Sequence, residues 1–145
     1  MTVKPLRQAA LVALVGTGLY VGVWAYFLPR EWYDGFPGFG RRWLPPLGPY
    51  NEHLAKDTGA LYLALSALTC AALRRAHSNR LVRTTGAAWL VFNTLHLLYH
   101  LQHLHVYGTT DKVLNVVGLG ALMLISAALL IPVQAAPRQP SRIDN

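Results

Sequence analysis

The sequence predicts an all-α protein built as a four-helix transmembrane bundle, and three observations support this. The chain has 145 residues, of which 53% are hydrophobic and 13% charged, whereas soluble domains carry about 25% charged residues. Four of its apolar stretches are long enough to cross a bilayer, which takes about 20 residues in a helix. The basic residues also cluster between these stretches on alternate sides, as in multi-pass membrane proteins. We therefore expect one transmembrane domain over residues 1–133.

The four expected spans cover residues 9–28, 54–73, 84–104 and 113–133. The first contains no charged residue, and the second is weaker because Lys56 and Asp57 lie in its first turn. Lys56 can still extend its amine outward from a helix end. The polar, proline-containing segment 134–145 is expected to form a disordered cytoplasmic tail.

Two rows of small residues suggest close helix packing. Gly18 and Gly22 are spaced so that another helix, including one from a second subunit, can approach the first span. In the second span, four alanines recur on one face, and such a row usually packs tightly against a neighbouring helix. These alanines are Ala60, Ala64, Ala67 and Ala71.

The basic residues favour an orientation with both termini in the cytoplasm (N-in, C-in). In this orientation the whole formal net charge of +7 falls on the inner side, and the charges on the outer side cancel. Cytoplasmic loops of membrane proteins are enriched in Lys and Arg. We therefore expect a multi-pass protein of the inner (cell) membrane whose partner is the lipid bilayer. Its basic character gives no reason to expect binding to nucleic acid.

The segment between the first two spans, residues 29–53, is rich in glycine, proline and aromatic residues and is expected to be the longest non-helical element. Two interpretations remain open. Trp and Tyr favour the membrane interface, so the segment could form an aromatic belt at the outer surface. Long ordered loops are also often functional, so it could be a lid over a site.

A row of polar and aromatic side chains marks the third span. At 100° per residue, six side chains fall in one narrow sector of that helix: Trp89, Asn93, His96, His100, His103 and Tyr107. Polar groups within a span almost always face the bundle interior or a cavity. We therefore predict a polar cavity open to the outer face, which Glu52 at the end of the long loop would also line.

Within this row, His100 and His103, supplemented by Asp57 or His53, are the candidate metal ligands. Imidazole and carboxylate groups are ligands for zinc, iron and copper. His96 and His103 lie about 10 Å apart along a straight helix and cannot share one ion. A haem held by two histidines would need His53 opposite His103. The single cysteine, Cys70, provides no cysteine-based metal or redox motif.

The histidine row leaves several functions open. Neutral histidines can simply hydrogen-bond between helices, bind a transition metal or haem, or form a pathway for protons or small solutes. No nucleophile and base motif or nucleotide fingerprint indicates an enzyme. The favoured hypothesis is an interaction or accessory module that associates with other membrane proteins or with itself.

The segment Gly48-Pro49-Tyr50-Asn51-Glu52-His53-Leu54-Ala55-Lys56-Asp57-Thr58-Gly59-Ala60-Leu61, followed by the histidine-bearing span, resembles a group of small four-span membrane proteins from actinobacteria. The group is functionally uncharacterised. The resemblance covers Pro37 to about Asn115 and implies the four-span fold. It implies no activity and no catalytic residues.

Overall fold

The computed structural model describes residues 3–133, so the predicted tail lies outside the described residues. The structure is 80% helical with almost no sheet, which confirms the predicted helical class. The α-helices among the described residues are α1 (Val3–Phe27), α2 (Pro29–Gly35), α3 (Glu52–Arg74), α4 (Asn79–Gln102) and α5 (Thr109–Ala128). Two-residue strands β1 (Pro37–Gly38) and β2 (Arg41–Arg42) pair antiparallel, and the 3-10 turns are η1 (Pro45–Leu47) and η2 (Leu104–Val106).

The four long helices coincide with the predicted apolar stretches, but several boundaries were wrong. Helix α4 ends at Gln102 because His103 leaves the helical conformation at the C-cap. Helix α5 begins at Thr109 and ends at Ala128, earlier than the expected 113–133. Residues 29–53, which were expected to be non-helical, begin with a short helix, α2, that starts at Pro29. Proline suits the first helical position because its fixed φ matches the helix and its missing N–H needs no partner there.

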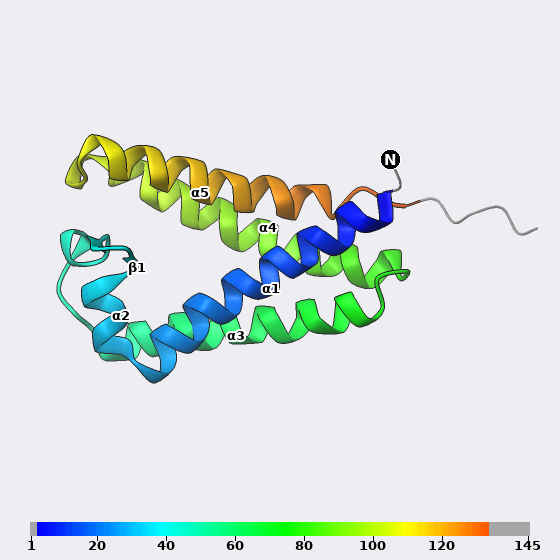
Figure 1. The fold of residues 1–145 in the computed structure, drawn as a ribbon, viewed down its shortest axis with the longest axis horizontal. Coiled ribbons are helices and arrows are strands. Elements are labelled where there is room, and N and C mark those ends of the chain that lie inside the picture. The colour runs from blue at the N-terminus through cyan, green and yellow to red at the C-terminus, as the bar shows by residue number, and fades with distance from the viewer. Residues whose placement is uncertain (1–2, 134–145) are drawn as a thin grey trace, which may run out of the picture.

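The long helices form two pairs, α1 with α3 and α4 with α5 (Figure 1). The start of α1, the α3–α4 turn and the end of α5 lie at one end of the bundle, here called the terminal end (Figure 1). Helix α2, the small hairpin and the α4–α5 turn lie at the opposite end, here called the loop end. In Figure 1 the two pairs spread apart toward the loop end.

Glycines allow α1 and α3 to approach closely. A Cβ atom on Gly59 would lie 2.6 Å from the backbone nitrogen of Tyr26, and one on Gly22 would lie 3.1 Å from the carbonyl oxygen of Gly59. A Cβ on Gly18 would overlap the hydroxyl of Ser66. Gly18 and Gly22, which we expected to be available to a second subunit, therefore pack inside the chain.

Polar side chains link the helices in the interior. Trp89 on α4 donates from Nε1 to Thr69 Oγ1 on α3 at 2.7 Å, and Asn93 donates from Nδ2 to Ser126 Oγ on α5 at 2.9 Å. Trp89, Asn93 and His100 are 0%, 1% and 6% exposed. Their burial confirms that this side of the third predicted span faces inward.

The outer surface of the bundle is largely apolar. Helix α1 from Pro5 and helix α5 are each long and apolar enough to cross a membrane, and only 33% and 11% of their most apolar windows are buried. A core helix of a soluble protein would be mostly covered. The alanine row of α3 is also exposed, so the expectation that it packs against a neighbouring helix is wrong for the described chain.

The close approach at Gly59 predicts a large effect from one methyl group. Gly59→Ala must push apart two backbones, so we expect it to destabilise the fold by about 1–3 kcal/mol. The matched control is Gly120→Ala in α5, where nothing lies within 4 Å of the added Cβ. It should melt at or above the wild-type temperature, because alanine favours helix. Thermal unfolding in mild detergent measures both, and equal melting of the two variants would contradict this packing.

Candidate functional site

The largest described cavity, of about 570 Å³, lies toward the loop end of the bundle. All four long helices contribute to its wall, together with α2 and the loop that follows it. Its volume falls in the range of small-molecule binding sites, roughly 300–1,000 Å³. On the four long helices, the lining residues with a polar group in the side chain are Thr17, Thr58, Tyr62, His96, Tyr99, His100 and Asn115. The cavity is therefore the best candidate for a functional site.

Helix α4 presents a column of contacting rings along this cavity, in which His96 and His100 meet edge-on. His96 stacks on Phe92 with ring centroids 5.4 Å apart, and the centroids of His96 and His100 are 4.7 Å apart. The ring of His100 in turn lies parallel to that of Tyr107, 6.4 Å away. These residues meet because positions 92, 96 and 100 follow each other at four-residue steps on one helix face. The column fixes the orientation of both imidazoles.

Residues 29–53, here called the aromatic loop, cover the cavity. Trp32, Phe36 and Trp43 line it together with Leu44 and Leu47. Trp32 is only 8% exposed, and its ring packs against Phe36 at 5.8 Å. Because these rings point inward, residues 29–53 are better interpreted as a lid over a site than as an aromatic belt at the outer surface.

Specific hydrogen bonds hold the loop in place. Trp43 donates from Nε1 to Asp111 on α5 at 2.9 Å, and Arg41 forms an ion pair with the same carboxylate. Tyr107 donates its hydroxyl to the carbonyl oxygen of Trp43 at 2.8 Å. Burial raises the pKa of Tyr107 to about 12, so its hydroxyl stays protonated and can donate at neutral pH.

Three residues that line the cavity carry a buried polar atom with no hydrogen-bond partner among the described residues. They are Trp32 (Nε1), His100 (Nδ1) and Asn115 (Oδ1). Unpaired buried polar atoms are unfavourable, by about 1–3 kcal/mol each. None of the described lining residues is Asp, Glu, Lys or Arg. The arrangement suits an uncharged occupant that offers both a hydrogen-bond acceptor and a donor.

The predicted cavity residues divide between the cavity and other positions. His96 lines the cavity, whereas Asn93 lies buried against α5 and Tyr107 anchors the loop. Glu52 is exposed at the start of α3, where it pairs with Lys56 at 3.0 Å. The predicted polar cavity is therefore a largely apolar one with a few polar groups.

The structure does not bring the four candidate metal ligands together. His53 and Asp57 pair with each other at 3.2 Å on the outward face of α3, where their side chains are 81% and 63% exposed. His103 lies beyond the end of α4, and its Nδ1 is 2.8 Å from the carbonyl oxygen of Tyr99. Within residues 3–133, no group of three or more His, Cys, Asp and Glu could hold a metal ion. Position 57 faces outward because Gly59 and Tyr62 occupy the inner face of α3.

Sequence reasoning did not identify Asn115 as a cavity residue, and it included Trp32, Phe36 and Trp43 only through the open interpretation of residues 29–53 as a lid. Asn115 had a usable signal, since an amide in an apolar span usually faces inward. For the three aromatic residues the signal reached only as far as the possible lid, because which rings of the loop turn inward depends on how the loop folds back.

The chain matches no protein-family model, and neither a curated protein nor a solved structure matches it. The resemblance to small actinobacterial membrane proteins therefore stays a prediction. Fold and site define a helical protein with two helices able to cross a membrane and an uncharged cavity beneath an aromatic loop.

The anchoring of the loop predicts how it responds to loss of Asp111. Hydrogen bonds to a charged group contribute about 1.5–3 kcal/mol, so Asp111→Ala should free the loop and accelerate exchange of the Trp43 amide roughly tenfold or more. Hydrogen exchange followed by mass spectrometry measures this on residues 36–48. Asp57→Ala removes an exposed carboxylate of α3 and is the control. Unchanged exchange in Asp111→Ala would show that these contacts do not hold the loop.

Proposed function

We propose that this chain is a four-span protein of the inner membrane, with both termini inside, and that its loop-end cavity binds an uncharged, largely apolar small molecule. The cavity of about 570 Å³ beneath the aromatic loop carries this proposal. With no catalytic group assigned, the protein would act as an accessory module that holds its ligand at the outer side of the membrane.

The exposed faces of α3 and α4 support four spans. Val91 and Leu95 on α4 are 62% and 63% exposed, and Leu61 on α3 is 44% exposed. Each helix is about 35 Å long, enough to cross the hydrocarbon core. The charged residues of α3 lie in its first two turns or at its last residue, and those of α4 in its first two turns. They would therefore lie in the headgroup region. These charges also explain why, of the described helices, only α1 and α5 are long and apolar enough, by length and composition, to cross a membrane.

The distribution of charge supports the orientation. The α3–α4 turn and its flanks carry Arg74, Arg75, Arg80 and Arg83 at the terminal end of the bundle. At the loop end, basic residues are matched by acidic ones, as in the ion pair of Arg30 with Asp34 at 2.7 Å. An excess of Lys and Arg marks the cytoplasmic side.

The lining of the cavity supports the binding of an uncharged small molecule over a pathway for protons or charged solutes. The described lining residues include no Asp, Glu, Lys or Arg, so a charged ligand would find no counter-ion there. The histidine column continues toward the terminal end as Phe92 and Trp89, whose rings supply no chain of proton carriers. The site therefore favours an apolar ligand whose polar group reaches His100 or Asn115.

The topology predicts opposite labelling of two introduced cysteines. In a Cys70→Ser background, Phe39→Cys in the hairpin should react with a membrane-impermeant maleimide in intact cells or right-side-out vesicles. His77→Cys in the α3–α4 turn should react only after permeabilisation. Phe39 is 97% exposed and His77 is also exposed, so both positions are reachable. Labelling of both from the same side would contradict an odd number of spans between the sites.

Ligand binding in the cavity predicts different probe labelling of two matched glycine variants. Neither Gly118 nor Gly120 has an atom within 4 Å of an added Cβ, but only Gly118 lines the cavity. We expect Gly118→Leu to fill the cavity and Gly120→Leu to leave it open. Photolabelling in lipid nanodiscs with 3-trifluoromethyl-3-phenyldiazirine, a neutral aromatic probe, should give adducts on His96 in the wild type and Gly120→Leu. Adducts should be several-fold fewer in Gly118→Leu.

Labelling of Leu95, on the exposed face of the same helix, is the internal reference for probe dissolved in lipid. His96 labelling that is absent from the wild type, or equal in all three proteins, would contradict binding in the cavity.

A further inference from the structure

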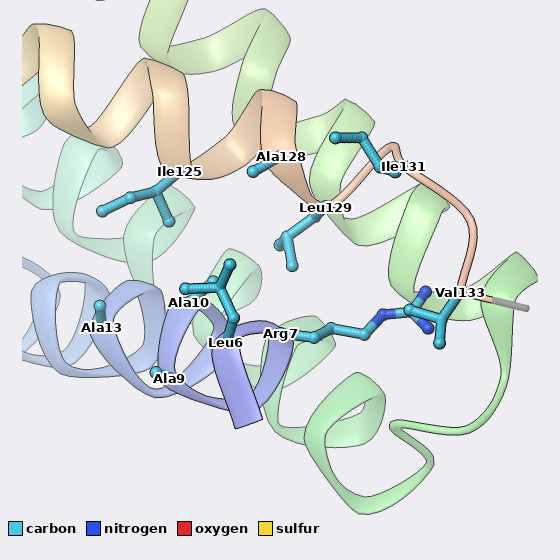
Figure 2. Close-up of a pocket in the computed structure, with 10 residues that line it drawn as sticks. All are labelled: Leu6, Arg7, Ala9, Ala10, Ala13, Ile125, Ala128, Leu129, Ile131 and Val133. Atoms are coloured by element: carbon cyan, nitrogen blue, oxygen red, sulfur yellow. The ribbon is translucent and has the colours of Figure 1, made fainter. Parts of the chain in front are cut away.

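A second hollow that could hold a ligand lies at the terminal end of the bundle, far from the cavity. An apolar groove of about 350 Å³ runs between the first turns of α1 and the last turns of α5 (Figure 2). Its wall is formed by alanine, leucine, isoleucine and valine side chains, and Arg7 is its one charged lining residue among those described. In Figure 2 the Arg7 side chain extends along the groove toward Val133.

Arg7 is a buried cation whose hydrogen bonds are only partly satisfied. It is 6% exposed, and its Nη1 donates to Asn79 Oδ1 at 2.7 Å. Its Nε and Nη2 have no partner among the described residues. An arginine stays charged in proteins, and a buried charge without a counter-ion is costly. The position therefore calls for an anion.

The described chain offers no carboxylate for this purpose. Its acidic residues lie in α2 or in the first two turns of α3 and α5, all at the loop end of the bundle. These residues are Glu31, Asp34, Glu52, Asp57 and Asp111. The sixth acidic residue of the sequence, Asp144, lies outside the described residues.

A smaller hollow of about 250 Å³ meets the groove at Arg7 and is basic. It is lined by Arg74 and His77, with Gln8, Leu73 and Ala76. An apolar groove and a basic hollow that share one buried arginine fit a ligand with an acyl chain and an anionic phosphate. Basic pockets between membrane helices on the cytoplasmic side bind phospholipid headgroups in this manner.

We propose that an anionic phospholipid of the cytoplasmic leaflet binds here, with its phosphate on Arg7 and Arg74 and an acyl chain in the groove between α1 and α5. This inference rests on the proposed membrane-spanning orientation but not on the ligand of the loop-end cavity. Arginine suits this role because its planar guanidinium can donate two parallel hydrogen bonds to one phosphate.

Native mass spectrometry of the full chain with added phosphatidylglycerol or phosphatidylcholine tests the proposal. We expect one phosphatidylglycerol to bind the wild type in preference to phosphatidylcholine. Arg7→Gln should weaken that binding roughly tenfold or more, which corresponds to the loss of about one charge-assisted hydrogen bond. Arg80→Gln, which removes a charge from the same end without lining groove or hollow, is the matched control and should bind as the wild type does.

A second variant keeps the test informative if Arg7→Gln does not fold. Ala13→Phe narrows the groove while leaving Arg7 in place and should also lose phosphatidylglycerol, whereas Ala67→Phe on the exposed face of α3 should not. Equal binding of the two lipids to the wild type, or equal binding by all variants, would overturn the proposal.

Two further measurements distinguish a lipid site from a site for a free anion and from an ion pair within the chain. Inorganic phosphate should not compete with the lipid, and competition would show that the site recognises a free anion. If Asp144 were the counter-ion of Arg7, Asp144→Asn would lower the melting temperature, and that result would also overturn the proposal. If the lipid-binding tests fail but the two introduced cysteines label from opposite sides as predicted, the four-span arrangement still holds.

Discussion

The close contact of α1 with α3 is the constraint on which the rest of the structure depends. Gly18, Gly22 and Gly59 let the two helices approach so closely that an added Cβ would meet backbone or side-chain atoms of the other helix. Because apolar side chains gain little by leaving lipid for another helix, such contacts and interhelical hydrogen bonds are the main attractions available in a membrane. The contact lies in the loop-end halves of α1 and α3, and neighbouring positions of the same segments, among them Val21 and Thr58, line the cavity.

The second helix pair is joined to the first by buried polar groups. Trp89 reaches Thr69 across the bundle, and Asn93 reaches Ser126 within the α4–α5 pair. At the terminal end, Asn79 accepts from Arg7 and also bonds both backbone groups of Val133. Buried polar residues thus lie among the apolar side chains of the core, while many other large apolar residues are exposed on the outside of the bundle. Both proposed sites lie where this packing leaves space at the two ends.

Hydropathy and helical periodicity predicted much of the fold. The positions of the four long helices and the inward face of Trp89, Asn93 and His100 followed from the spacing of apolar and polar residues. The loop was beyond such reasoning, because its path depends on single contacts such as those of Trp43 and Tyr107 with residues about 65 positions away. The rotation of α3 was equally hidden. His53 and Asp57 could be placed near His100 only by assuming a face that Gly59 and Tyr62 in fact occupy.

The proposed four-span arrangement requires that the exposed apolar faces of all four long helices contact lipid, and α4 tests this best because it is not one of the two helices whose length and composition mark them as able to cross a membrane. Nitroxide spin labels placed singly from Ala88 to Tyr99 in liposomes would report access to oxygen, which dissolves in lipid, and to a water-soluble nickel chelate. We predict oxygen access that peaks at Val91, Leu95 and Leu98 with helical periodicity, and low access to both reagents at Trp89 and Asn93. High access to the nickel chelate at Val91 and Leu95 would show that this face lies in water and would contradict the four-span arrangement.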